Sequence, residues 1–268
     1  MVVEHLEAPL RRVQRPPFGI FGVFSDPPFG VFSDHVAETK QTVKATTMVF
    51  RIPKDELIFP DPHLAEDDGL LCIGGDLSPE RLILAYHHGI FPWFSFRDRH
   101  SPHWYCPKQR FVIFPDEIHV SHSMRTLINK GKYRVSINQD FDGVIHGCSL
   151  AQNRIDMEGA WLGDDIIEAY TALHRMGWAA SVEVWDEEDH LVGGLYGVTV
   201  NGCFIGESMF SLVPSASKLA LIGLAYHMQD MGWKLIDCQL ETPHLRSMGA
   251  RFIPYDDYMS ILTTPRCQ

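Results

Sequence analysis

Apolar and polar residues follow regular periods from about residue 48 to the end of the chain. Apolar residues at helical spacing predict helices, several of them ending at a glycine. The predicted helices span 79–88, 121–131, 164–177, 215–231 and 255–263. Alternating or short apolar runs predict strands. The predicted strands span 110–114, 181–185, 195–200, 203–207 and 234–239.

Three local signals refine this pattern. Ser78 precedes Pro79 and is the predicted N-cap of the first helix, which Gly89 ends. Asn201-Gly202 separates two predicted strands and is the strongest short hairpin signal. The Pro-rich aromatic segment GIFPWFS at 89–95 is predicted to be a loop.

The order of elements predicts the fold class. From about residue 110 it reads strand, helix, strand, strand, strand, helix, strand, helix. This order is typical of an α+β, or mixed α/β, domain with an antiparallel-rich sheet. We therefore predict a small N-terminal domain over 48–109 and a larger domain over 110–268.

Residues 1–47 differ from the rest of the chain. They contain a near-repeat, PPFGIFGVFSD at 16–26 followed by PPFGVFSD at 27–34, with Pro and Gly too frequent for helix or strand. Five basic and five acidic residues leave the segment neutral. We expect either that Met48 is the natural start and the extension is not native, or that the extension is a disordered appendage.

Composition excludes several classes of protein. The 268 residues are 45% hydrophobic and 21% charged, as in ordinary globular proteins, and no apolar run reaches the ~18 residues of a membrane span. A net charge of −11 argues against a protein that coats nucleic acid. The six cysteines lack zinc-ligand spacing, and the N-terminus lacks a signal-peptide pattern. We expect reduced thiols, no metal, no membrane partner and a cytoplasmic protein.

One segment, 104–134, is basic on this acidic chain. It has six basic residues against Asp116 and Glu117. The basic residues are Lys108, Arg110, Arg125, Lys130, Lys132 and Arg134. Two interpretations are open: a solvated helix face, or a local contact for an anionic partner.

Several strings in the chain are specific when taken together and in order. They are GGDLSPERL (74–82), AYHHGIFPWFS (85–95), the lone Trp161, GESMFS (206–211), ASKLAL (216–221) and LIDCQ (235–239). From about Phe59 to about Tyr258 the chain resembles the leucyl/phenylalanyl-tRNA–protein transferase family.

The resemblance implies a fold and an activity. The fold is a small N-terminal domain followed by a GNAT-like acyltransferase domain. The activity is transfer of Leu, Phe or Met from aminoacyl-tRNA to the α-amino group of a protein that begins with Arg or Lys. The new terminus then marks the protein for degradation. No cofactor is implied.

The resemblance also implies site residues. The implied catalytic residues are Asp237, Gln239 and Glu207. The implied adenosine and aminoacyl contacts are Trp93, Tyr86, Trp161 and Tyr170. The implied pocket for the transferred side chain consists of Leu195, Phe204, Leu221, Leu224 and Ile236. The implied tRNA contacts are Arg125, Lys130, Lys132 and Arg134.

Most of these residues have a structural interpretation beside the functional one. Trp93 is either a buried aromatic residue or a stacking surface for the terminal adenosine. Glu207 either forms an ion pair with a Lys or Arg or contacts the acceptor's cationic terminus. Tyr170 lies on the apolar stripe of its predicted helix, and the five pocket residues are of types that usually form core.

The strand period makes two further predictions. Asp237 and Gln239 are two residues apart on a predicted strand, so they should project from one face. Strict alternation instead places Phe204 opposite Glu207. Either a bulge at Gly206 redirects the strand, or the pocket wraps around a strand edge.

Three rival functions differ in the residues that they need. A CoA-dependent N-acetyltransferase needs a Gly-rich phosphate loop, and SLVPSASKLAL at 211–221 has no glycine. A non-catalytic tRNA-binding or degron-binding module has no use for Glu207, Asp237 and Gln239 together. A peptidoglycan-bridge aminoacyl transferase fits the strings GESMFS and IDCQ poorly.

Overall fold

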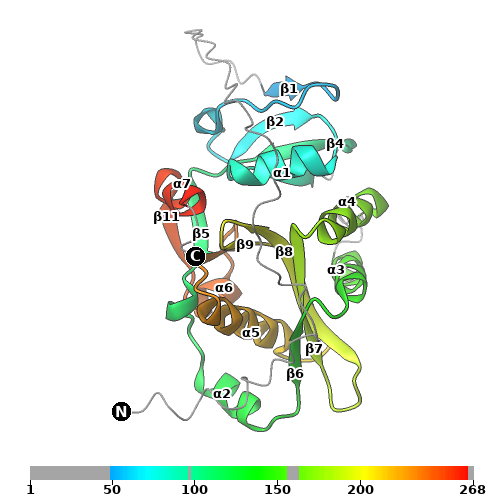
Figure 1. Cartoon of the computed structure of the whole chain (residues 1–268), viewed down its shortest axis with the longest axis vertical. Coiled ribbons are helices and arrows are strands. Elements are labelled where there is room, and N and C mark those ends of the chain that lie inside the picture. Colours follow the sequence, from blue (N-terminus) through cyan, green and yellow to red (C-terminus); the bar gives the residue numbers. More distant parts are fainter. Residues whose placement is uncertain (1–48, 96–97, 156–162, 265–268) are drawn as a thin grey trace.

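A computed structural model describes residues 49–95, 98–155 and 163–264. The expectations for Trp161 and for residues 1–47 therefore lie outside the described residues. The described strands form one sheet of four strands and one of seven, both visible in Figure 1. None of the helices in these ranges is long and apolar enough to cross a membrane.

The four-stranded sheet lies at one end of the molecule. Its strands are β1 (Phe50–Ile52), β2 (Leu70–Gly74), β3 (Phe91–Ser95) and β4 (Asp98–Tyr105), in the order β1-β2-β4-β3. A short 3-10 turn, η2 (Pro62–Leu64), and helix α1 (Pro79–His87) complete this part. Helix α1 lies between the two sheets and contacts β3, α4 and β8.

The predicted loop at 89–95 is wrong, because β3 occupies most of it. Pro92 and the aromatic residues were the reason for predicting a loop. However, β3 is an edge strand, paired in the described chain with β4 alone, and an edge strand tolerates the missing backbone N–H of Pro. The predicted end of α1 is confirmed, since Gly89 has a φ of 68°. Ser78 occupies the N-cap position, but its hydroxyl donates to Asp76 instead of capping the helix.

The seven-stranded sheet is mixed and largely antiparallel. Its order is β11-β5-β10-β9-β8-β7-β6, and among the described pairs of this sheet only β9 and β10 run parallel. The strands are β5 (Gln109–Ile113), β6 (Arg134–Ile137), β7 (Ala179–Trp185), β8 (Leu191–Val200), β9 (Cys203–Ser211), β10 (Leu235–Asp237) and β11 (Arg251–Pro254). The predicted mixed α/β class is confirmed. The domain boundary near residue 109 stays a prediction.

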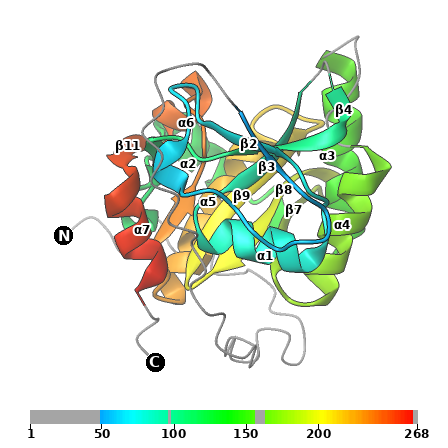
Figure 2. The same ribbon diagram turned by 90° about the horizontal axis from the view of Figure 1, so that it is seen from above.

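Helices cover both faces of this sheet. They are α2 (His122–Asn129), α3 (Phe141–Ile155), α4 (Asp164–Arg175), α5 (Ala216–Asp230), α6 (Pro243–Ser247) and α7 (Tyr255–Thr263), with a 3-10 turn η3 (Pro115–Glu117). Helix α5 covers one face and forms one hydrophobic cluster with it. Helices α3 and α4 cover the other face, and the view from above in Figure 2 shows them together, across the molecule from α7.

The predictions made from the strongest local sequence signals are confirmed. All five predicted helices are present, and α7 has the predicted bounds. The hairpin is also confirmed, because Asn201 and Gly202 have φ angles of 48° and 75°, as a type I′ turn requires. The strands β1, β2 and β4 were not predicted, and neither were four elements that follow residue 110: β6, α3, α6 and β11. Three of these four have five residues or fewer, which is too short for a periodic pattern, and α3 contains Gly143 and Gly147.

Candidate active site

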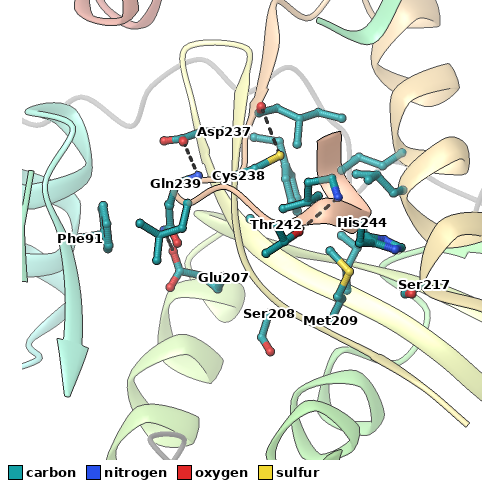
Figure 3. A pocket seen from close by; sticks show the side chains of 18 of the residues that line it. Phe91, Glu207, Ser208, Met209, Ser217, Asp237, Cys238, Gln239, Thr242 and His244 are labelled. Carbon is teal, nitrogen blue, oxygen red and sulfur yellow. Dashed lines mark hydrogen bonds between the residues drawn. The ribbon is translucent and has the colours of Figure 1, made fainter. Parts of the chain in front are cut away.

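A pocket opens in the seven-stranded sheet where β10 ends early. The parallel strands β9 and β10 pair from Cys203 and Leu235 to Ile205 and Asp237. Strand β9 then continues to Ser211, whereas the chain leaves the sheet after Asp237. The resulting cavity has a volume of about 470 Å³ and is shown in Figure 3.

The half of the cavity that faces α5 is apolar. All five residues implied for the side-chain pocket line it, and all are buried. They come from four elements: Leu195 on β8, Phe204 on β9, Leu221 and Leu224 on α5, and Ile236 on β10. The structure therefore brings these residues together, although they also belong to the hydrophobic core beneath α5.

A β-bulge turns Glu207 into the same cavity. Gly197 of β8 pairs with Gly206, and Tyr196 pairs with Ser208, so Glu207 is the extra residue on β9. The bulge that was one of two predicted alternatives is thus present, and the cavity also follows the free edge of β9. Gly197 is required here, because a Cβ would lie 2.2 Å from the carbonyl oxygen of Ile205.

Glu207 is surrounded by neutral hydrogen-bond donors. The hydroxyl of Tyr86 donates to Oε1 at 2.8 Å, and the hydroxyl of Tyr170 donates to Oε2 at 2.8 Å. The side-chain amide of Gln239 donates to Oε1 at 3.1 Å. Among the described residues no ion pair includes Glu207, so this part of the chain gives no support to the ion-pair interpretation.

This environment changes the acidity of Glu207. Burial raises its pKa from the usual 4.5 to about 7, and the hydrogen bonds from Tyr86 and Tyr170 offset part of that rise. The nearby charge of Asp237 raises the pKa further. Glu207 can therefore exchange a proton near neutral pH.

Asp237 has a different partner. It is fully buried and forms an ion pair with Arg110, whose Nε lies 3.4 Å from Oδ1 and whose Nη2 donates to Oδ2. The Nη1 of Arg110 donates to the carbonyl oxygen of Gly89. The guanidinium also lies between the rings of Phe91 and Tyr258, 5.1 and 4.5 Å from their centroids. Arg110 is therefore not part of a surface basic patch.

Gln239 does not continue the strand, which corrects the predicted strand over 234–239. Strand β10 ends at Asp237, and Gln239 has a φ of 61°, a left-handed conformation that is unusual for a residue other than glycine. Its backbone N–H donates to Oδ1 of Asp237 at 2.8 Å. Asp237 and Gln239 therefore do not project from one strand face. Asp237 instead holds the turn that directs the Gln239 side chain to Glu207 (Figure 3).

The implied adenosine contacts fall into two groups. Trp93 lines the cavity from β3, half-buried and 5.6 Å edge-to-face from Tyr105. Phe91 lines the cavity from the same strand. Tyr86 and Tyr170 are only 1% and 0% exposed and lie behind Glu207, outside the cavity lining. Both hydroxyls are held by Glu207, and direct contact of these two residues with a ligand stays a prediction.

The implied tRNA contacts lie away from the cavity. Helix α2, which carries Arg125, is at the opposite end of the molecule from the four-stranded sheet (Figure 1). Arg125, Lys130 and Lys132 are exposed, so they are free to meet a ligand at the surface. Arg134 is half-buried, pairs with Asp189 at 3.0 Å and stacks 5.1 Å from the ring of Trp185.

Sequence reasoning missed three residues of the site. Met209 and His244 line the cavity, and neither carried a local signal. Arg110 did carry one, since it is the charged residue of the otherwise apolar run RFVIF. The thiol of Cys238 also lines the cavity, but burial and the charge of Asp237 raise its pKa, so it stays protonated and is a poor nucleophile.

Comparison with known proteins agrees with the family resemblance that the sequence motifs indicated. A family model described as leucyl/phenylalanyl-tRNA protein transferase matches residues 112–263, and the model of its N-terminal domain matches residues 75–108. A transferase of that name from Desulforapulum autotrophicum is 49% identical over 79% of this chain and 90% of its own length. Another from Syntrophus aciditrophicus is 48% identical over 77% and 84%.

Among solved structures, L-PGS from Bacillus licheniformis aligns with a TM-score of 0.36 and 14% identity, over 68% of this chain and 57% of its own. This likeness is too low to carry an argument. The sequence relatives define the class, because all are aminoacyltransferases and match most of the chain. The chain belongs to the leucyl/phenylalanyl-tRNA protein transferase family.

Proposed function

We propose that this chain transfers Leu, Phe or Met from aminoacyl-tRNA to the α-amino group of proteins that begin with Arg or Lys. The observation that carries the proposal is the division of one cavity into an apolar half and a half that contains an unpaired carboxylate, Glu207. Such a cavity suits an apolar acyl group on one side and a cationic amine on the other.

The apolar half is proposed to hold the side chain of the donor. Its five residues offer only hydrocarbon and aromatic surface, which favours Leu, Phe and Met over polar side chains. Trp93, which lines the cavity from β3, is proposed to stack on the terminal adenosine, an interaction worth roughly 1–3 kcal/mol per base. Trp161, outside the described residues, keeps its implied role in the same contact.

The polar half is proposed to receive the acceptor terminus. A carboxylate without a protein cation attracts the ammonium or guanidinium of an N-terminal Arg or Lys. Gln239 donates its amide N–H to Glu207, which leaves its carbonyl oxygen to accept a hydrogen bond from the attacking amine. Asp237 acts on Gln239 through the backbone and is therefore a positioning residue.

The surface around α2 is proposed to contact the tRNA. Residues 1–47 are neutral, so the whole charge of −11 belongs to residues 48–268, and Arg125, Lys130 and Lys132 are exposed cations on this acidic body. Arg134 adds a fourth positive charge nearby, although Asp189 already pairs with it.

We place the reaction in the cytoplasm, where the modified proteins are marked for degradation.

The test is transfer of labelled Leu from Leu-tRNA to three peptides that differ only in their first residue. An Arg peptide should accept Leu, and an Ala peptide should not. A citrulline peptide, which keeps the shape of Arg without its charge, should accept Leu at least tenfold more slowly. Equal transfer to all three peptides would reject the acceptor class, and transfer to none would reject the function.

A further inference from the structure

Three oxygen-bearing groups at the polar end of the cavity form a closed triangle. The hydroxyl oxygens of Tyr86 and Tyr170 are 2.5 Å apart, and each lies 2.8 Å from a different oxygen of Glu207. Each side of the triangle is a hydrogen-bond contact, and each such contact needs one hydrogen atom. The two hydroxyl groups supply two.

The third hydrogen comes from Glu207 itself when its carboxyl group is protonated. The hydrogen bonds then run in one direction, from Glu207 to Tyr86, from Tyr86 to Tyr170, and from Tyr170 back to Glu207. When Glu207 is ionised, both hydroxyls donate to it, and the two hydroxyl oxygens face each other without a hydrogen between them. The triangle is therefore complete only after Glu207 takes up a proton.

We propose that Glu207 is the proton acceptor of the transfer reaction, with Tyr86 and Tyr170 as the groups that hold the transferred proton on it. This inference rests on the proposed function, because it takes the acceptor amine to lie in the polar half of the cavity. It goes further by giving Glu207 a chemical role at the α-amino group of the acceptor, in addition to its attraction for the cationic terminus.

The surroundings of Glu207 leave it as the group best able to take this proton. Asp237 is buried and neutralised by Arg110, and an amide such as Gln239 is not a base. The ring of Tyr196 packs edge-to-face against that of Tyr170, and burial raises the pKa of its hydroxyl well above 10. The pKa of Glu207, raised to about 7 mainly by burial, is close to the value of about 7.7–8.0 for an α-amino group.

The step balances as follows. The neutral amine attacks the ester carbonyl carbon, the C–N bond forms, and the nitrogen gives one proton to the Glu207 carboxylate. The C–O bond to the ribose of the tRNA breaks, and the ribose oxygen leaves with the electron pair of that bond. Glu207 then returns the proton to this oxygen, which becomes a hydroxyl, and the carboxylate is regenerated.

The first test compares the wild type with Glu207→Gln on the Arg and citrulline peptides across pH. Transfer by the wild type needs two deprotonations, of the amine and of Glu207, so log kcat/KM should rise with a slope of about two on the acid limb. In Glu207→Gln the slope should fall to about one, and kcat should drop about 100-fold on both peptides.

The outcomes separate this proposal from the proposed function. A rate loss confined to KM of the Arg peptide, or a slope that stays at two, would overturn the proton role. Equal use of both peptides by the wild type would reject the acceptor class, while a 100-fold loss on both would still support the proton role. A wild type that uses neither peptide would overturn both.

A second pair of variants covers the case in which Glu207→Gln folds poorly. Tyr86→Phe and Tyr170→Phe each remove one donor to the carboxylate, so the acid limb should move up by about one pH unit. Tyr196→Phe is the matched control, because among the described residues its hydroxyl has no hydrogen-bond partner. An unmoved limb in both Tyr86→Phe and Tyr170→Phe, or an equal move in the control, would overturn the proposal.

Discussion

Two carboxylates on neighbouring strands of one sheet have opposite surroundings. Asp237 on β10 is fully buried against the guanidinium of Arg110, whereas Glu207 on β9 is held by two hydroxyls and an amide. Asp237 is fully buried and Glu207 is half-buried, but burial alone does not account for their different chemistry. Their partners distinguish them, because Asp237 is paired with a fixed cation, whereas Glu207 has only neutral donors and burial raises its pKa to about 7.

The comparison separates a carboxylate that stabilises the fold, Asp237, from a carboxylate that can take part in the reaction, Glu207. The Asp237–Arg110 pair joins four parts of the chain: β10, β5, the turn at Gly89 and helix α7 with Tyr258. Through the backbone of Gln239 it also sets the conformation of the next residue in the site. Glu207 also links several elements, because Tyr86 on α1, Tyr170 on α4 and Gln239 after β10 hold it, but these partners are all neutral and its carboxylate lines the cavity (Figure 3).

Arg110→Ala should lower the stability of the fold more than any other change considered, because it leaves Asp237 without a cation, as Glu207 is. Leaving one member of a buried ion pair unpartnered costs about 3–5 kcal/mol of unfolding free energy. Urea denaturation would measure this loss. The double variant Arg110→Met, Asp237→Asn removes both charges and should recover most of the stability, but not the transfer rate. Arg110→Ala with wild-type stability would contradict the structural role of the pair.

The second prediction concerns Glu207 and the pH dependence of stability. Its pKa is about 7 in the folded chain and near 4.5 in the unfolded chain, so between these pH values the folded state binds more protons. The stabilisation is complete below about pH 4.5 and is lost as pH rises through 7, by up to roughly 3 kcal/mol. Urea denaturation from pH 4 to 8 should show this fall relative to Glu207→Gln. Parallel curves for the two proteins would contradict it.

The smallest expected effect concerns tRNA binding by the surface around α2, which lies far from both carboxylates. Arg125→Ala combined with Lys130→Ala should lower the slope of log affinity for tRNA against log salt by about two, one for each lost phosphate contact. The pH profile of the transfer should not move, since neither residue lies near Glu207. Arg175→Ala, which removes an exposed charge at the end of α4, is the matched control. The same slope change in that control would show that overall charge, not the α2 surface, holds the tRNA.

Much of the fold followed from local signals in the sequence. Helix periodicity, the glycine stops and the Asn201-Gly202 turn act within a few residues, so the structure could not easily override them. The loop predicted over 89–95 failed for the opposite reason. Pro92 is locally unfavourable in a strand, and only pairing with β4 at a sheet edge makes β3 possible.

The site was predictable in its residues but not in its geometry. The five apolar residues do meet in one cavity, yet the bulge at Glu207 and the left-handed turn at Gln239 break the strand period that was used to orient them. Tyr170 seemed an ordinary core residue, and it is buried, but its hydroxyl meets a carboxylate 37 positions away. Arg110 was counted with the surface charges because nothing near it in the sequence reveals Asp237, 127 positions away.

The early end of β10 has a practical consequence for protein engineering. Because the cavity passes around that strand end, its apolar half lies on the α5 face of the sheet and its polar half on the α4 face. Residues such as Leu221 and Leu224 can therefore be redesigned to admit larger or unnatural acyl groups without altering the residues that meet the acceptor. Selectivity for the acyl group and selectivity for the acceptor can therefore be altered independently of each other.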